Sequence, residues 1–465
     1  MKHAAVLAIL IAVAFGMSRG KIHHGPYGYD EADYMFAAGL GIADNWIDSG
    51  SMSIADFISV GRKRGADSSQ QAGLSTLARA GADPVVYRHW HGPLYYFWLT
   101  AISKLSLNEH GARALFLIFP ILTACVIYFG TLGLFDGLQG QIAAILASAL
   151  FLWSPIELET SEIAPHLMFV LWYICGLLLL ARVALHGSRR SFYAATLVAG
   201  LAFCTLEVDF VLILVLIIVA WWKREALRTD WKLIRNSILL FLGTVLLVWP
   251  SAILKLNFAK AYMVMAYLAV FRKGAWGDVT FSQTWMRRLQ MTPVELILIA
   301  IGLVLFFTMM SRRDRVVAMP FLLFSILMFL ATARVYTFIA RYMTPFLPAF
   351  DVLAGWAIAS ALLRLKRPSA VYGAAGVAAL LLVWNAQQRL STLNRGEDPA
   401  AFAKINAIRA QGLSDKVVLV PRGDIPQIHY YFPRMKTEAY AEDSPIPASG
   451  SFAGVIYPDG RVESR

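Results

Sequence analysis

The chain has 465 residues, of which 58% are hydrophobic and only 15% are charged, and its formal net charge at pH 7 is +12. A soluble domain is closer to half apolar and a quarter charged, whereas the apolar residues here are gathered into runs long enough to cross a bilayer. This composition excludes an ordinary soluble protein. Because much of the basic charge lies in short loops between apolar runs, it indicates membrane topology rather than nucleic-acid binding.

The first apolar run, Met1 to Met17, is typical of either a cleaved signal peptide or a first spanning helix. We expect a retained helix, because no clean cleavage site precedes Arg19. Either interpretation places the following polar loop outside the cytoplasm, and we expect this first outward loop to occupy residues 19–111. The run Leu94 to Leu107 within it is short for a span, so we expect a helix lying in the membrane interface.

Further apolar runs follow, and with the first helix they predict about 11 transmembrane helices in an all-α polytopic fold. Almost every second short loop is basic, which is the positive-inside pattern of cytoplasmic loops, with the turn at Asp136 to Gln139 as the exception. This alternation predicts that the chain ends outside the cytoplasm. No internal repeat is visible, which is evidence against the repeat-built transporter folds. The runs lie near residues 112–135, 140–157, 164–184, 192–206, 209–222, 234–254, 294–310, 316–333, 342–363 and 370–385.

The composition changes sharply after the last apolar run. We expect residues 1–385 to form the membrane domain and residues 386–465 to form a small soluble α/β domain on the outer side. Within this second domain, Ala401 to Gln411 has helical character, whereas Lys416 to Val420 and Phe452 to Tyr457 have the pattern of short strands.

An acidic pair, Asp30 and Glu31, follows the first helix. One interpretation is that the pair only begins an interfacial helix, since acidic side chains favour a first turn. Each of the other outward carboxylates alone fits a solvated loop end. Ionisable groups at membrane depth usually face a cavity or pathway, however, and together these carboxylates indicate a polar cavity. They are Glu157, Glu159, Glu162, Glu207 and Asp209.

Basic residues lie on the same outer side. Arginine pairs with phosphate through two hydrogen bonds, so these side chains are candidates for binding a phosphate group, and each also fits an anchor for lipid headgroups. Arg341 is the strongest candidate, because it stands at the entry of a span punctuated by Pro345 and Pro348. The set is Arg88, Arg113, Arg272, Lys273, Arg287, Arg288, Arg334 and Arg341.

Four motifs occur in order between residues 20 and 350. They are Asp-Glu-Ala-Asp-Tyr after the first helix, His-Gly-Pro-Leu-Tyr-Tyr at the end of the long loop, Arg113 at the start of the next span, and Arg341-Tyr342-x-x-Pro345-x-x-Pro348. This series resembles the GT-C glycosyltransferases, in particular the branch that contains the protein O-mannosyltransferases and the lipid A aminoarabinose transferase. The resemblance implies a GT-C membrane fold and a donor whose sugar is linked to a polyprenyl phosphate rather than to a nucleotide.

The resemblance also implies roles for individual residues. Asp30 matches the acidic residue taken as the general base, and Glu31 and Tyr34 match its neighbours. The other matches are the segment that lines the site, His91, Pro93, Leu94 and Tyr95, and the late pair near the lipid phosphate, Arg341 and Tyr342.

The sequence departs from the pattern of the GT-C relatives at three places. Gly92 replaces a proline, which we expect to loosen that turn. His166 follows Pro165 where many relatives have an aspartate; imidazole also binds divalent metals, so His166 is either a metal ligand or a structural histidine. Thr205-Leu206-Glu207 replaces a Thr-Lys sequence, so a basic contact to phosphate is lost or replaced.

We therefore expect an inverting glycosyltransferase in the bacterial inner membrane, with its active site facing the periplasm. Asp30 and Glu31 are the expected catalytic residues, with Asp30 accepting the proton of an acceptor hydroxyl during attack on the sugar, while Arg341 with Arg272 or Arg88 stabilises the departing phosphate. Expected partners are membrane lipid, the lipid-linked sugar and a lipid, glycan or protein acceptor, without nucleic acid. A divalent metal is a possible cofactor through His166. The expected cavity lining is Tyr34, His91, Pro93, Tyr95, Glu159 and Glu162.

Three other functions remain open. A flippase or transporter of lipid-linked sugar needs the cavity and the arginines but no base. A polymerase or ligase that joins whole glycans from a lipid pyrophosphate also needs outward arginines and carboxylates, although an acidic pair so close to the first helix favours the GT-C interpretation. A purely structural scaffold is disfavoured, because so many ionisable residues lie at span ends on one side.

Overall fold

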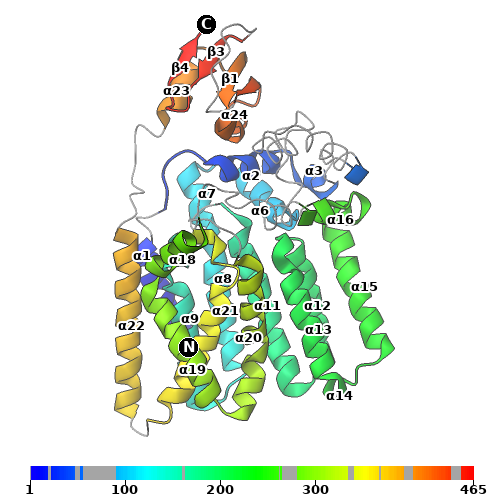
Figure 1. Ribbon diagram of the computed structural model, residues 1–465, viewed down its shortest axis with the longest axis vertical. Helices are drawn as coiled ribbons and strands as arrows, with labels where there is room; N and C mark the ends of the chain where they lie inside the picture. Colours follow the sequence, from blue (N-terminus) through cyan, green and yellow to red (C-terminus); the bar gives the residue numbers. More distant parts are fainter. Residues whose placement is uncertain are drawn as a thin grey trace.

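The computed structural model describes residues 2–18, 22–47, 53–55, 91–159, 163–260, 262–263, 280–333, 340–365, 368–391, 402–440 and 452–465. They are mainly helical. Long helices lie side by side in one layer, and short helices and a small α/β unit lie beyond one end of that layer (Figure 1). The long helices are α1 (Lys2–Ser18), α7 (Glu109–Phe116) with α8 (Ile118–Leu132), α9 (Gly137–Leu152), α11 (Pro165–His186), α12 (Arg189–Phe203), α13 (Phe210–Trp222), α15 (Trp231–Val248), α19 (Pro293–Thr308), α20 (Arg312–Thr332), α21 (Leu347–Leu362) and α22 (Pro368–Ser391).

Short helices lie between the layer and the α/β unit, and α14 (Arg224–Leu227) lies at the opposite end of the layer (Figure 1). Those near the α/β unit are α2 (Tyr29–Gly39), α3 (Ile42–Ile47), α6 (Leu94–Ser103), α16 (Pro250–Leu254) and α18 (Phe281–Met291). Three further short elements connect long helices: α10 (Pro155–Glu159) and the 3-10 turns η3 (Glu207–Asp209) and η4 (Ala340–Tyr342).

The long helices have the length and composition of membrane spans. Among the described residues, four segments are long and apolar enough to cross a bilayer, namely Glu109–Leu132, α11, α15 and α20. The pair Ser282–Met291 and Pro293–Thr308, bent by 93°, adds a fifth if it is one broken span, and α1, α9, α13 and α21 are apolar helices of 10–17 residues. The chain is therefore a membrane protein, while the total of about 11 spans stays a prediction.

Local sequence sets the ends of several long helices. α11 begins with Pro165 in its first turn, where a missing N–H costs nothing, and ends at Gly187, whose φ of 64° lies in the left-handed region. At the start of α15 the side chain of Asp230 accepts a hydrogen bond of 2.7 Å from the N–H of Leu233. These boundaries do not depend on distant parts of the chain.

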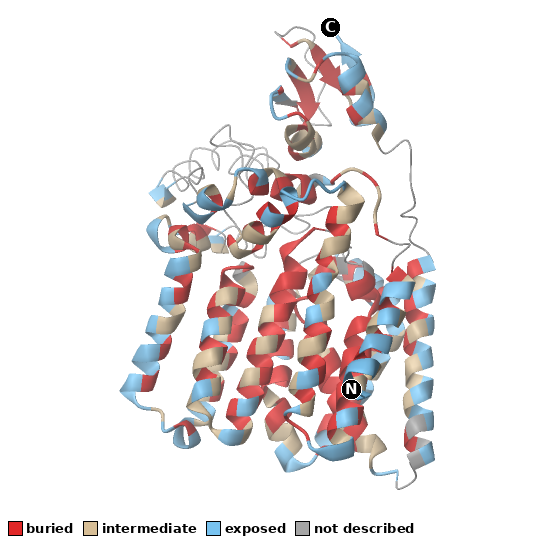
Figure 2. Ribbon diagram, turned by 180° about the vertical axis from the view of Figure 1, so that it is seen from behind, coloured by how far each residue is buried: buried red, intermediate tan, exposed pale blue. Residues whose placement is uncertain are grey.

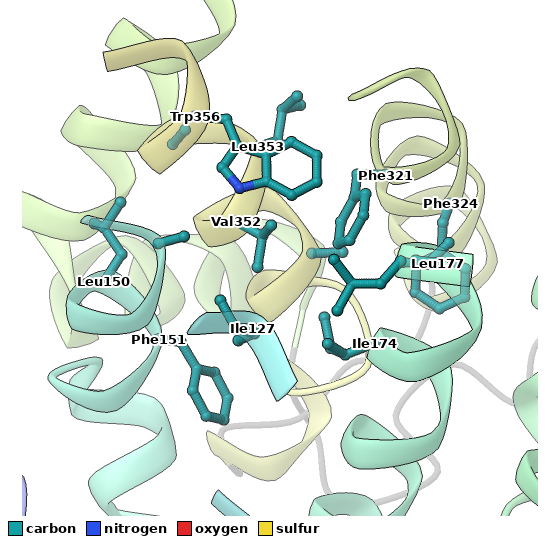
Figure 3. Close-up of a cluster of buried hydrophobic side chains, with 14 of the residues drawn as sticks. Ile127, Leu150, Phe151, Ile174, Leu177, Phe321, Phe324, Val352, Leu353 and Trp356 are labelled. Atoms are coloured by element: carbon teal, nitrogen blue, oxygen red, sulfur yellow. The ribbon is translucent and has the colours of Figure 1, made fainter. Parts of the chain in front are cut away.

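α11 lies at the centre of the layer and α15 at its edge. In the 18-residue apolar stretch of α11, 78% of the residues are buried, whereas only 22% are buried in that of α15. Figure 2 shows exposed residues along the outermost helices. Small residues let α9 and α21 approach closely, because a Cβ on Gly355 would lie 2.5 Å from the main-chain nitrogen of Ala147. Figure 3 shows part of the apolar core formed by α8, α9, α11, α20 and α21: Ile127, Leu150, Phe151, Ile174, Leu177, Phe321, Phe324, Val352, Leu353 and Trp356.

The α/β unit after α22 has its own sheet and core. Its strands are ordered β2 (Lys436–Tyr440), β1 (Val417–Pro421), β3 (Gly454–Ile456) and β4 (Val462–Ser464), with β1 parallel to both neighbours and β4 antiparallel to β3. The helices α23 (Ala403–Ala410) and α24 (Ile425–Tyr431) contribute side chains to its core. α24 also packs against α2, which joins this unit to the layer of short helices.

Candidate active site

The two acidic residues of the first turn of α2 point to different partners. The helix begins after Gly28, whose N–H donates a hydrogen bond of 3.2 Å to Oε2 of Glu31. Because an α-helix turns by about 100° per residue, the neighbouring carboxylates of Asp30 and Glu31 leave the helix in different directions. Each forms an ion pair with a separate arginine.

Glu31 is fixed in a buried ion pair with Arg113 at the start of the α7–α8 segment. The guanidinium donates from Nε to Oε1 (2.8 Å) and from Nη2 to Oε2 (2.5 Å). The N–H of Ile163 also donates to Oε1 (3.0 Å). Burial by itself raises the pKa of Glu31, but the hydrogen bonds and charge of Arg113 and the main-chain donors outweigh it and hold this pKa below 4.5. Glu31 is therefore a carboxylate with its oxygens fully engaged.

Arg113 also holds the chain that leads into α2. Its Nη atoms donate to three main-chain carbonyl groups, those of His23 (3.0 Å), Gly25 (2.7 Å) and Pro26 (3.1 Å). An arginine can donate five hydrogen bonds in a fixed plane, and here that plane ties α7 to both sides of the α2 entry. The pair of Glu31 and Arg113 thus sets the position of the first turn of α2.

Asp30 forms an ion pair with Arg341 of η4. The side chain of Asp30 is 26% exposed, whereas that of Glu31 is 8% exposed. The guanidinium of Arg341 also lies over the ring of Tyr342, 5.7 Å from its centroid. Asp30 is therefore the more accessible acid of the pair, and it lies against the arginine that stood out most in the sequence.

Aromatic side chains from α2 and α6 form a wall next to this ion pair. The hydroxyl of Tyr34 is hydrogen-bonded to Nε2 of His91 (3.1 Å), and its ring meets those of Tyr95 and Tyr96 edge to face, with centroids 5.4 and 6.2 Å away. Burial, and next the negative charge of Asp30, raises the pKa of Tyr34 well above 10. Tyr34 is therefore a neutral hydroxyl beside the carboxyl group of Asp30. Pro93, also buried, stands at the start of α6.

Gly92 has a packing role instead of loosening its turn. A Cβ at this position would lie 2.0 Å from the main-chain carbonyl oxygen of Cys204 at the end of α12. The same oxygen accepts a hydrogen bond of 3.1 Å from the N–H of Leu94. The approach of two backbones excludes every side chain here, so the expected looseness gives way to a tight contact between α6 and α12.

His166 lies against the late motif but has no set of metal ligands around it. Its ring meets that of Tyr342 edge to face, with the centroids 5.9 Å apart, and its Nδ1 atom has no hydrogen-bond partner. Within the described ranges, no group of three or more His, Cys, Asp and Glu side chains is arranged to hold a metal ion. The interpretation of His166 as a metal ligand therefore gains no support from the described part of the chain.

Several candidate residues lie outside the described residues. Arg88, Arg272 and Glu162 fall in gaps of the described ranges, and although Glu159 ends α10, its side chain is not described. The structure therefore neither joins these four residues to Asp30 nor separates them from it.

The sequence analysis named only one member, Glu157, of a group of three buried acids. Glu157 of α10, Glu295 of α19 and Asp351 of α21 are 4%, 0% and 0% exposed. Glu295 accepts hydrogen bonds from Ser154 (3.0 Å) and Thr292. Charged residues inside apolar runs are rare and mark polar interiors. The position of Glu295 and Asp351 inside apolar runs was therefore a sequence signal for such an interior, although both lie outside the outward loops. The burial of Glu157 shows that it is not a solvated loop end.

Comparison with known proteins identifies the fold. No family model and no curated protein sequence matches the chain. The apo oligosaccharyltransferase of Archaeoglobus fulgidus superposes with a TM-score of 0.59 at 12% identity, over 93% of this chain and 64% of that one. ArnT from Cupriavidus metallidurans gives a TM-score of 0.55 at 15% identity, over 94% of this chain and 85% of that one in the apo state. ArnT bound to undecaprenyl phosphate gives the same TM-score and identity over 95% and 86%.

Both proteins are GT-C membrane glycosyltransferases. At 12% and 15% identity the likeness concerns the fold, and this chain spans 64% of the length of the oligosaccharyltransferase. The chain therefore has the GT-C fold, which confirms the resemblance seen in the sequence.

Proposed function

We propose that this GT-C protein moves a sugar from a polyprenyl phosphate to a hydroxyl group of a lipid, glycan or protein, with inversion at the anomeric carbon. One observation carries the proposal: the accessible carboxylate of Asp30 lies against the guanidinium of Arg341. A base for the acceptor and a cation for the phosphate of the donor stand together. The neighbours ArnT, solved with undecaprenyl phosphate, and AglB, solved with a dolichol-phosphate, agree with such a donor.

In the proposed reaction Asp30 accepts the proton of the acceptor hydroxyl as its oxygen attacks the anomeric carbon. The bond from that carbon to the phosphate oxygen breaks on the opposite face, and its electron pair leaves with the polyprenyl phosphate. A positioned base contributes about 10²–10⁴-fold to such a step. Arg341 keeps its positive charge at every physiological pH and stabilises the negative charge that develops on the phosphate.

The other residues around Asp30 have supporting roles in this proposal. Glu31 is held by Arg113 and the main chain, so we assign it to positioning rather than to proton transfer. Tyr34 and Tyr95 are 4% and 0% exposed, so in this proposal they pack behind the site, and the half-buried His91 is the member of the aromatic wall that can reach a sugar. The ring of Tyr342 supports Arg341, whose guanidinium carbon lies over it at 5.7 Å from the centroid.

The same proposal implies an orientation of the protein in the membrane. The donor's lipid tail remains in the bilayer while its sugar reaches the layer of short helices, which faces the periplasm of a bacterium. The basic loops at the opposite end of the long helices then face the cytoplasm. Adding α12 and α22 to the apolar helices described above gives the predicted spans, α1, α7 with α8, α9, α11, α12, α13, α15, α19, α20, α21 and α22.

A transfer assay tests this function. Purified protein in lipid vesicles receives polyprenyl-phosphate sugars with a labelled sugar and extracts of cell-envelope lipids, glycans and proteins, and mass analysis identifies the product. Asp30→Asn is expected to insert normally and to transfer about 10²–10⁴-fold more slowly. Asp136→Asn is the matched control, because Asp136 is also paired with an arginine (3.6 Å from Arg313) but is 92% exposed.

Two outcomes would overturn the proposal. A wild-type rate for Asp30→Asn removes Asp30 as the base. Movement of the lipid-linked sugar between leaflets, without transfer to any acceptor, favours the flippase instead.

A further inference from the structure

The C-terminal α/β unit grips the chain that leads into α2. Tyr431 of α24 accepts a hydrogen bond through its hydroxyl from the N–H of Tyr27 (3.0 Å) and donates one to the carboxylate of Glu109 (2.7 Å). Gln427, one turn earlier on α24, donates from Nε2 to the carbonyl oxygen of Tyr27 (2.9 Å). Both main-chain polar groups of Tyr27 are therefore bound by side chains of the C-terminal unit, about 400 residues later in the chain.

Ring contacts complete the same joint. Tyr27 is 1% exposed and meets the ring of Tyr430 edge to face, with the centroids 5.1 Å apart. The guanidinium of Arg113 lies 5.2 Å from the ring centroid of Tyr27. Figure 1 shows α24 directly beside α2 at this end of the molecule. Tyr27 thus lies between the C-terminal unit and the arginine that holds Glu31.

The contacts of Arg113 and those of α24 hold the same short segment. Arg113 holds the main chain before Tyr27 and the side chain of Glu31 after it, while α24 holds Tyr27 itself. Asp30 lies between these fixed points and forms its ion pair with Arg341. A displacement of Tyr27 therefore moves the first turn of α2, and with it the carboxylate of Asp30.

We infer that the C-terminal unit positions the catalytic carboxylate, with Tyr431 and Gln427 as positioning residues for the transfer reaction. This inference rests on the proposed function of Asp30. The α/β unit has a core of its own, and its Tyr430 and Tyr431 also pack against the apolar cluster of α2 and α6. Two of the hydrogen bonds described above go beyond this packing, because they bind the main chain of Tyr27, three residues before Asp30, where errors of about 1 Å reduce catalysis strongly.

Tyr431→Phe tests the inference, because it removes both hydrogen bonds and keeps the ring. The expected result is a kcat lowered about 10-fold, in line with the loss of two hydrogen bonds, and a KM for the donor lipid within about twofold of the wild type, since Arg341 is untouched. Tyr457→Phe is the matched control: Tyr457 donates a hydrogen bond of the same 2.7 Å to a glutamate, Glu463, on an exposed part of the same unit.

Hydrogen exchange provides a readout that does not depend on turnover. The N–H groups of residues 22–31 are expected to exchange faster in Tyr431→Phe than in the wild type, while those of α6 keep their wild-type rates. Wild-type kcat in Tyr431→Phe, or an equal loss of kcat in Tyr457→Phe, would overturn the inference. Full turnover by Asp30→Asn would remove the proposed function, whereas the exchange result would still report the docking of α24.

Discussion

Asp30 and Arg341 form an ion pair although they are 311 positions apart in the sequence. The pair joins the first turn of α2 to η4, which precedes α21, so it links the outward layer at the start of the chain to the last helices of the membrane layer. Under the proposed function, we expect a donor phosphate that binds Arg341 to compete with Asp30 for the guanidinium and so to free the carboxylate for the acceptor.

Arg341 is expected to be as important as Asp30. Arg341→Ala should lower kcat about 10²–10³-fold, as the loss of a preorganised donor to developing charge does, and should raise KM for the donor. Arg341→Lys keeps the positive charge but lacks the planar guanidinium that can donate two parallel hydrogen bonds. Its kcat in the transfer assay should lie between those of Arg341→Ala and the wild type. Arg313→Ala serves as the control, because Arg313 is 60% exposed; an unchanged kcat for Arg341→Ala would contradict the assignment.

Glu31→Gln should destabilise the protein rather than alter its chemistry. The substitution leaves the positive charge of Arg113, which is 1% exposed, without its counter-ion, and breaking a buried pair in this way costs about 3–5 kcal/mol. The midpoint of thermal unfolding in detergent should fall accordingly. Asp230→Asn is the control, since its pair with Arg189 (3.2 Å) is exposed and asparagine caps a helix equally well, so the midpoint of unfolding should change little. Equal midpoints in the two variants would refute a stabilising role for Glu31.

The stabilising effect of Glu31 should depend on pH. Its pKa in the folded protein lies below 4.5 despite burial, because Arg113 favours the ionised form. A carboxyl group whose pKa is lowered by folding stabilises the folded protein at pH values above its ordinary pKa. That stabilisation is lost as the pH falls through the pKa of the folded state. The difference in unfolding midpoint between the wild type and Glu31→Gln should therefore be constant near pH 7 and shrink below pH 4.5. A difference that stays constant down to pH 3 would show that ionisation of Glu31 is irrelevant.

Gly92→Ala should impair folding. Its Cβ would lie 2.0 Å from the carbonyl oxygen of Cys204, which is main chain and has little room to move. We expect a loss of about 1–3 kcal/mol and poor recovery of folded protein in detergent. Gly243→Ala in α15 is the matched control, because nothing lies within 4 Å of its Cβ position and alanine favours a helix. Normal stability of Gly92→Ala would show that the two backbones separate readily.

The sequence was sufficient for the features that depend on local composition and on the order of motifs. Runs of apolar residues identified a membrane protein, and the ordered motifs pointed to the GT-C fold. It also selected Asp30 and Arg341 as candidates, because both residue types suit the proposed chemistry.

Apart from the family resemblance, the residue types by themselves did not separate the roles of the two acids. Asp30 and Glu31 are adjacent and chemically alike, and only their partners distinguish them: Glu31 meets Arg113, 82 positions away, and Asp30 meets Arg341. The role of Gly92 could not be inferred from the sequence either, because glycine is required there by the close approach of the Cys204 backbone. The burial of Glu157 and Asp351 likewise comes from helices packed around them.

By itself the sequence determined what kind of protein this is and which side chains are available for chemistry, since apolar runs and motifs can each be recognised within a short stretch of the chain. Only the tertiary structure decided which carboxylate stays accessible, which arginine it meets, and that the end of the chain holds the segment near its beginning. Those outcomes depend on contacts between residues about 80 to 400 positions apart, and such contacts form only when the helices have packed.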